Sequence, residues 1–220
     1  MDRTFAVRRV LIYTLAANAV IAIAKVAYGY STNSISIISD GFHSIFDGLS
    51  NVIGLIGIRL AFHPPDARHP YGHRKYETLF TITIASMIIF MSFQIIRKVY
   101  MSFFEAQKTE VTAISFLVML ITMAVNIVVA LYESRKGREL NSEFLAADAK
   151  HTQSDILVSL SVIIGLVFYR LGYHRADAIV GIVIVVLIGK IGFDILRHAS
   201  DILVDTVRID TASIEDVVNS

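Results

Sequence analysis

The sequence predicts an all-α membrane protein, a bundle of six transmembrane helices. Of its 220 residues, 55% are hydrophobic and the mean hydropathy is +0.62, which is more apolar than a soluble domain of this length needs. Six apolar stretches each reach the roughly 20 residues that a helix needs to span a bilayer. All three prolines, Pro64, Pro65 and Pro70, fall between two of these stretches, so no span contains a helix-breaking proline.

The expected spans follow one another with short connections. They cover residues 10–30, 34–62, 76–103, 111–132, 142–171 and 176–195. At the span ends and in the segments outside the spans, twelve Lys and Arg residues lie on the side of the N-terminus and five on the opposite side. Because positive charge is retained on the cytoplasmic side, this asymmetry places both termini in the cytoplasm.

Three lysines fall within the expected spans. Lys25 and Lys190 lie near span ends, where a long side chain can reach water. Lys150 neighbours His151 but lies about 100° around the helix from it, so we expect it to face a cytoplasmic vestibule. The net charge of +1 gives no basic field for nucleic acid, and the absence of Cys excludes disulfides and thiolate ligands.

The second and fifth spans carry the same pattern of ionisable residues. Its positions are Asp40, His43 and Asp47 and, 108 positions later, Asp148, His151 and Asp155. At these spacings three side chains lie within roughly 60° on one helix face. Ionisable groups inside a membrane are costly and mark functional sites. Because the copies are three spans apart, their helices run in opposite directions, which is the character of an inverted repeat.

The two copies together offer two imidazoles and two carboxylates. We expect the ligands to be His43, Asp47, His151 and Asp155, a set that suits tetrahedral Zn²⁺. Two imidazoles favour Zn²⁺, Co²⁺, Cd²⁺ or Fe²⁺ over Mn²⁺ and Mg²⁺, which prefer more oxygen ligands. Asp40 and Asp148 lie one turn further toward the start of their spans, where they hold a His ring or form steps in the ion path, with direct ligation of the metal as the less favoured alternative.

Such a site binds metal only when its His residues are neutral and its Asp residues are ionised. Protonation therefore expels the metal, which predicts an exchange of protons for a divalent cation. A passive metal channel is the alternative that this pattern leaves open. The chain has no H-E-x-x-H or G-x-S-x-G motif, so nothing in it indicates an enzyme.

A second candidate site lies in the connection between spans two and three. Asp66, His69 and His73 have D-x-x-H-x-x-x-H spacing, but the prolines around them break any helix. Spacing alone leaves two interpretations, a solvated polar loop or an open three-ligand site that captures metal at the cytoplasmic mouth.

Taken together, these motifs resemble the cation diffusion facilitator family of proton-coupled efflux transporters. The resemblance covers six spans, the paired H-x-x-x-D motifs with their preceding acids, and the loop D-A-R-H-P-Y-G-H-R-K-Y-E, and Asp177 opens span six as in many relatives. It implies a Zn²⁺/H⁺ antiporter, since the His-Asp/His-Asp set looks like the zinc branch. The resemblance also supports Asp66, His69 and His73 as a second zinc site.

The resemblance also implies features beyond the six spans. Relatives usually continue into a ferredoxin-like cytoplasmic domain, so we expect a transmembrane domain over residues 1–207 and the truncated start of the cytoplasmic domain over 208–220. A family member that lacks the cytoplasmic domain is the alternative. It implies a homodimer, with Lys75 and Asp205 either as a charge interlock near the membrane surface or as solvated charges. The loop 133–142 lacks a His-rich insert, which favours a prokaryotic inner membrane.

Overall fold

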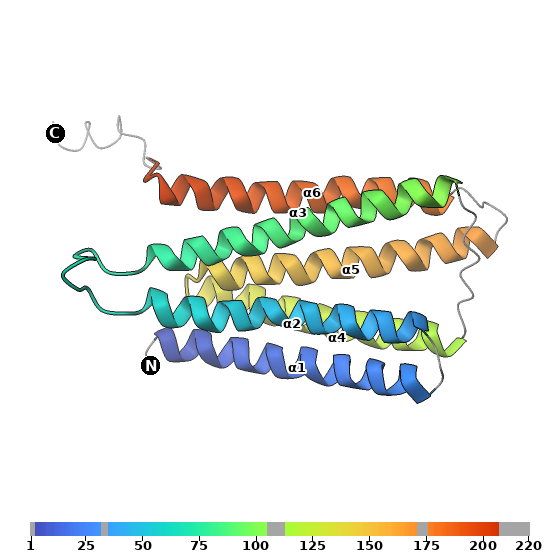
Figure 1. The fold of residues 1–220 in the computed structure, drawn as a ribbon, viewed down its shortest axis with the longest axis horizontal. Coiled ribbons are helices and arrows are strands. Elements are labelled where there is room, and N and C mark those ends of the chain that lie inside the picture. The colour runs from blue at the N-terminus through green and yellow to red at the C-terminus, as the bar shows by residue number, and fades with distance from the viewer. Residues whose placement is uncertain (1–2, 32–34, 105–112, 171–175, 207–220) are drawn as a thin grey trace.

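The computed structural model describes residues 3–31, 35–104, 113–170 and 176–206, and these form six α-helices. The helices are α1 (Arg3–Ser31), α2 (Ile35–Ala61), α3 (Lys75–Phe104), α4 (Ala113–Glu139), α5 (Glu143–Arg170) and α6 (Ala176–Leu203). The predicted fold class is confirmed. Figure 1 shows the helices lying side by side along the length of the molecule.

Three of the helices extend further than the apolar pattern predicted. The sequence placed the first residue of α1 at 10 and the last residues of α4 and α6 at 132 and 195, whereas these ends lie at Arg3, Glu139 and Leu203. A helix does not stop where its residues become polar, because its backbone hydrogen bonds continue until a cap replaces them. The assignment of residues 133–142 to a loop was therefore wrong, since only 140–142 connect α4 to α5.

Four helical segments in the described part of the chain are long and apolar enough to cross a membrane. They are Arg3–Ser31, Lys75–Arg97, Phe116–Glu139 and Ile179–Leu203. The two remaining helices, α2 and α5, are the ones that carry the repeated ionisable pattern.

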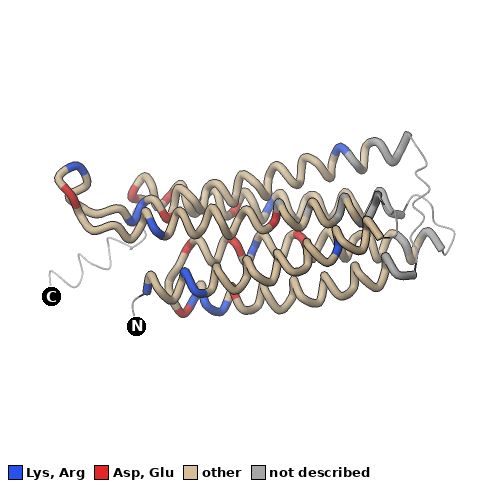
Figure 2. Tube along the Cα trace, turned by 60° about the horizontal axis from the view of Figure 1, so that its bottom comes forward, with Lys and Arg blue, Asp and Glu red and all other residues tan. Residues whose placement is uncertain are grey.

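The helices pack as neighbouring pairs around α5. α1 packs mainly against α2, α3 against α6 and α4 against α5, and α5 also contacts α3 and α6. α1 begins and α6 ends at the same end of the bundle as the α2–α3 loop and the α4–α5 turn (Figure 1). Figure 2 shows charged residues gathered toward this end, with fewer along the bundle.

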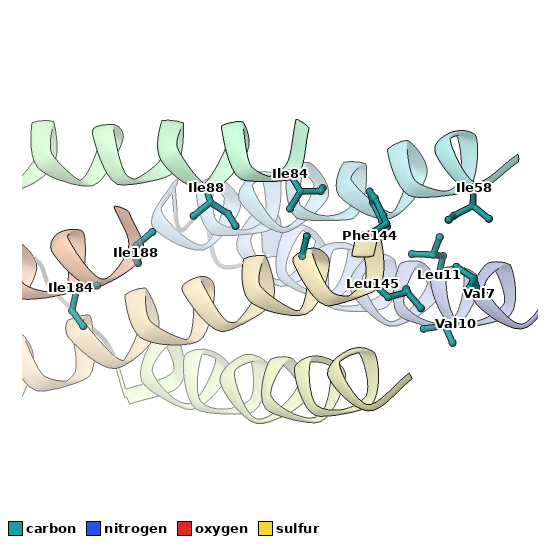
Figure 3. Packing of buried hydrophobic residues seen from close by; sticks show 11 residues of the cluster. Val7, Val10, Leu11, Ile58, Ile84, Ile88, Phe144, Leu145, Ile184 and Ile188 are labelled. Atoms are coloured by element: carbon teal, nitrogen blue, oxygen red, sulfur yellow. The ribbon is translucent and has the colours of Figure 1, made fainter. Parts of the chain in front are cut away.

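A buried apolar cluster joins five of the helices near this end and through the centre (Figure 3). Its members are Val7, Val10, Leu11, Ile58, Ile84, Ile88, Phe144, Leu145, Ala147, Ile184 and Ile188. Phe144 lies directly against Gly54 of α2, where an added Cβ would collide with the ring. Glycine at this position therefore lets α2 and α5 approach each other closely.

The turn between α4 and α5 is fixed by backbone capping. Asn141 has a φ of 46°, its N–H donates to Arg138 O (3.3 Å), and the N–H of Ser142 donates to Gly137 O (2.9 Å). This is a Schellman motif, with Asn141 as the left-handed residue. Ser142 then caps α5 by accepting the N–H of Leu145 at 3.4 Å. The short turn fixes the start of α5 against α4.

Candidate metal centre

Three of the four predicted ligands of the membrane site converge between α2 and α5. Asp47, His151 and Asp155 each offer a ligand atom within 4.8 Å of the others. His151 and Asp155 are four residues apart on α5, and residues at this spacing lie one above the other on a helix. His151 is 5% exposed, and both carboxylates are half-buried. Two oxygen donors and one nitrogen donor from two helices thus lie within reach of a single cation.

The His151 ring is buried without a hydrogen-bond partner. Neither Nδ1 nor Nε2 has one among the described residues. A buried polar group left unsatisfied costs about 1–3 kcal/mol, so native structures rarely leave both nitrogens of an imidazole without partners. Coordination of a cation by one nitrogen would provide a partner for it, and this observation favours a metal site over a packing role.

The fourth predicted ligand, His43, lies on α2 one turn before Asp47, but its side chain is outside the described part of the structure. The same holds for the side chains of Asp40 and Asp177. The sequence spacing of four residues predicts that His43 and Asp47 share one face of the helix. Its ligation stays a prediction from the sequence.

Asp148 makes no hydrogen bond to a histidine ring among the described side chains. Its Oδ2 instead accepts the Nδ2–H of Asn51 at 2.7 Å, and Asn51 also donates to Thr14 Oγ1 at 3.1 Å. Asn18 donates to the Oδ1 of Asn51 at 3.0 Å. Asp148 is thus part of a buried polar cluster that involves α1 and α2.

A buried glutamate, which the sequence analysis placed in a loop, completes this polar cluster. Glu133 of α4 is 1% exposed, and its Oε2 accepts the Thr152 hydroxyl at 3.4 Å. Its carboxyl group also interacts with Thr14 and Asp148. Sequence reasoning missed Asn51 and Glu133, although Asn51 lies four residues after Asp47 and so extends the polar stripe of α2 by one turn.

The loop residues form a second compact cluster. Asp66, His69 and His73 each offer a ligand atom within 4.8 Å of the others. Asp66 Oδ1 lies 3.2 Å from His69 Nδ1, and Asp66 Oδ2 lies 3.6 Å from His73 Nε2. The structure therefore brings together the three residues that spacing alone could not place.

Backbone contacts order this loop cluster. Asp66 Oδ1 accepts the N–H groups of Arg68 (2.8 Å) and His69 (2.7 Å), an Asx-type turn. The His69 N–H holds the pKa of the Asp66 carboxyl below its usual range. His73 Nδ1 lies 3.2 Å from the carbonyl oxygen of His63, and a proton on Nδ1 leaves the lone pair of Nε2 for a cation.

The outcome for the charged side chains outside these clusters is mixed. Lys75 Nζ donates to Asp205 Oδ2 at 2.7 Å and to Leu203 O at 3.2 Å, linking α3 to the end of α6 within one chain. Lys150 lines a cavity of about 600 Å³ at the end with the α4–α5 turn, in agreement with its predicted vestibule position. Lys190 is exposed. The prediction for Lys25 was wrong, because it is buried and donates to Ser44 Oγ at 2.9 Å.

Comparison with known proteins identifies the family of this chain. Residues 11–204 match the family described as the cation efflux transmembrane domain. The chain belongs to this cation efflux family. It is 37% identical over 197 residues to the uncharacterized transporter MJ0449 of Methanocaldococcus jannaschii, covering 90% of this chain and 70% of that protein. The family resemblance predicted from the sequence is confirmed.

Two further relatives of this cation efflux protein carry functional names. The manganese efflux system protein MneP of Bacillus subtilis is 28% identical over 216 residues, covering 95% of this chain and 72% of MneP. The cation-efflux pump FieF of Shewanella oneidensis is 27% identical over 185 residues, covering 84% of this chain and 62% of FieF. The cation efflux protein is therefore an integral membrane transporter of divalent metal cations, in a family of transporters and not of enzymes.

Proposed function

We propose that this cation efflux protein exports Zn²⁺ from the cytoplasm in exchange for protons. The observation that carries the proposal is the buried His151 ring, whose nitrogens have no partner in the described structure and which lies beside two carboxylates. Three such donors hold a cation, and His43, one turn before Asp47 on α2, is the proposed fourth ligand.

The choice of zinc rests on the type of donor. A set of two imidazoles and two carboxylates gives four-coordinate nitrogen and oxygen ligation, which Zn²⁺ favours. Mn²⁺ prefers oxygen ligands in octahedral geometry. The names of MneP and of the related MneS, which is 28% identical over 200 residues, make Mn²⁺ the second candidate. Fe²⁺, Co²⁺ and Cd²⁺ are further alternatives that the same donors accept.

Proton exchange follows from the same donors. Metal binding requires neutral imidazole and ionised carboxylate, so each bound cation displaces protons and each protonation weakens the metal. A passive metal channel would lack this coupling, and its flux would not respond to a pH gradient.

The loop cluster is proposed to capture metal at the cytoplasmic mouth. Its support is the convergence of Asp66, His69 and His73 at the end of the bundle where α1 begins and α6 ends. Both chain ends on the cytoplasmic side of a prokaryotic inner membrane agree with the excess of Lys and Arg at that end. A homodimer, in which the Lys75–Asp205 pair stiffens the surface that meets a second copy, completes the proposal.

Metal uptake into reconstituted vesicles tests the transport site. Wild-type protein is expected to accumulate Zn²⁺ in vesicles with an acidic interior, because protons that leave the vesicle drive the metal in. Asp155→Ala is expected to lose this uptake while its helical circular dichroism stays unchanged. Glu139→Ala, at the exposed end of α4, is the matched carboxylate control and should transport like wild type. Normal Zn²⁺ flux through Asp155→Ala would refute the assignment.

Two further comparisons in the same vesicles separate the alternatives. Uptake of Zn²⁺ and Mn²⁺ is measured for wild type and for His43→Asp, which exchanges a nitrogen ligand for oxygen. We expect the Zn²⁺/Mn²⁺ uptake ratio to fall in the variant. Asp66→Ala should raise the metal concentration needed for half-maximal uptake without abolishing flux.

A further inference from the structure

The buried carboxyl groups of Glu133 and Asp148 face each other across the α4–α5 interface. Each residue is 1% exposed, and the Thr152 hydroxyl joins them, 3.4 Å from Glu133 Oε2 and 3.2 Å from the backbone oxygen of Asp148, so that the two carboxyl groups interact. Ionised carboxylates accept hydrogen bonds but cannot donate them. A contact between two of them away from water therefore requires a shared proton, as in other paired carboxyl sites.

The neighbours of the pair indicate which group carries the proton. Asp148 Oδ2 accepts an N–H from Asn51, which suits an ionised carboxylate, while Asp148 Oδ1 has no donor among the described residues if both carboxyls are ionised. A proton on Glu133 gives the pair the donor that two carboxylates lack. Around Glu133 lie the hydroxyl groups of Thr14 and Thr152, which are neutral.

The position of the pair links it to the transport site. Asp148 and His151 are three residues apart on α5, so Asp148 lies about 4.5 Å along the helix axis from His151, on the side of the α4–α5 turn. His151 is the ionisable neighbour of Asp148 on the same helix. A divalent cation at His151 favours loss of the shared proton, because it stabilises a second negative charge nearby.

We propose that Glu133 holds a proton, donated to Asp148, that is released to water when metal binds and regained when metal leaves. The pair is then a proton-binding site distinct from the metal ligands. On proton loss Glu133 becomes a carboxylate, and the added negative charge is balanced by the incoming cation. This inference rests on the proposed proton-coupled transport and names one group that carries the exchanged proton.

Counting protons released on metal binding tests the proposal. Zn²⁺ is titrated into purified protein in two buffers of different ionisation enthalpy, and the calorimetric difference gives the protons released per metal. We expect Glu133→Gln to release about one proton fewer than wild type, since glutamine keeps the hydrogen bond but has no exchangeable acid proton. Glu139→Gln, on the same helix and exposed, is the matched control and should release as many protons as wild type.

Infrared spectroscopy of wild type gives a readout that does not depend on a variant folding. A carbonyl band of a protonated carboxylic acid should be present in the metal-free protein at neutral pH and should disappear on adding Zn²⁺. Its absence in the metal-free protein overturns the proposal. In vesicles, Glu133→Gln should retain exchange of Zn²⁺ for Zn²⁺ while its net uptake responds less steeply to the pH gradient.

The outcomes separate this inference from the proposed function. If wild type releases no protons and its flux ignores a pH gradient, proton coupling itself is wrong and both proposals fall. If wild type is coupled but Glu133→Gln releases as many protons as wild type, only the role of Glu133 is refuted.

Discussion

Replacing His151 with leucine is expected to stabilise the metal-free protein while removing its response to metal. The ring is 5% exposed, and neither nitrogen has a partner in the described structure. Each buried unsatisfied group costs about 1–3 kcal/mol, whereas an apolar side chain of similar size has no such cost. Taking the lower figure for both nitrogens, His151→Leu should gain about 2 kcal/mol, or about 4–8 °C in apparent melting temperature for a chain of this length.

Bound metal should make wild type more stable than His151→Leu, which reverses their order in the metal-free state. A ligand at 100 times its dissociation constant stabilises the folded state by about 2.7 kcal/mol, and this gain requires an intact site. Wild type should therefore be the less stable protein in chelator and the more stable one in Zn²⁺. Both are measured by thermal unfolding in detergent at one scan rate, in an Asp66→Ala background so that the loop cluster does not contribute.

One result would refute this reasoning directly. If His151→Leu melts below wild type in chelator, the His151 ring stabilises the metal-free protein and is not an unsatisfied group whose partner is the metal. His198→Leu, an exposed histidine of α6, is the control. Its stability should change by no more than about 0.5 kcal/mol, and its response to metal should be kept.

Three further predictions concern the scaffold and the loop. Gly54→Ala should lower stability by about 1–3 kcal/mol and weaken metal binding, because the new methyl collides with the Phe144 ring and separates α2 from α5. Ser142→Ala should cost about 1–2 kcal/mol in thermal unfolding, since it removes the cap of α5. The lowered pKa of Asp66 means that the loop turn, followed by hydrogen exchange of the His69 amide, stays intact from pH 7 to pH 5.

Controls make each of these predictions specific. Phe144→Leu should partly restore metal binding to Gly54→Ala, and a failure to do so would contradict the collision argument. Ser86→Ala, at an exposed position of α3, should leave the melting temperature unchanged. A carboxylate with a lowered pKa contributes its stability above its unfolded value and loses it as pH falls through the folded one. Loss of protection at pH 5 would therefore show that Asp66 does not hold the turn.

The sequence predicted the helices and the polar stripes because both depend on regular spacing. Apolar length predicted six helices, four of which are long and apolar enough to cross a membrane among the described residues, and a spacing of four residues placed His151 and Asp155 on one face of α5. Helix ends were predicted less well, since α4 continues for seven residues beyond Tyr132. That error concealed Glu133, which a hydropathy pattern assigns to a polar loop although it is buried.

What spacing could not predict was the partner that each polar side chain meets. Asp148 repeats the position of Asp40, but its direction depends on Asn51 and on Glu133, which come from other helices. Lys25 is close to a helix end and is nevertheless buried against Ser44. The loop cluster also depends on backbone N–H groups, whose positions follow from a turn that prolines permit but do not determine.

The packing of α5 suggests why the metal site lies between α2 and α5. α5 packs mainly against α4 and also contacts α3 and α6, while its contact with α2 is limited and includes the Gly54–Phe144 approach. Where two helices share little apolar surface, a cation that both coordinate contributes a large part of what holds them together. Loss of the cation then weakens the association of α2 with α5 more than the association of any other helix pair in the described bundle. A ligand shifts a conformational equilibrium only through such a difference, so metal at this interface is well placed to bias the position of α2 during transport.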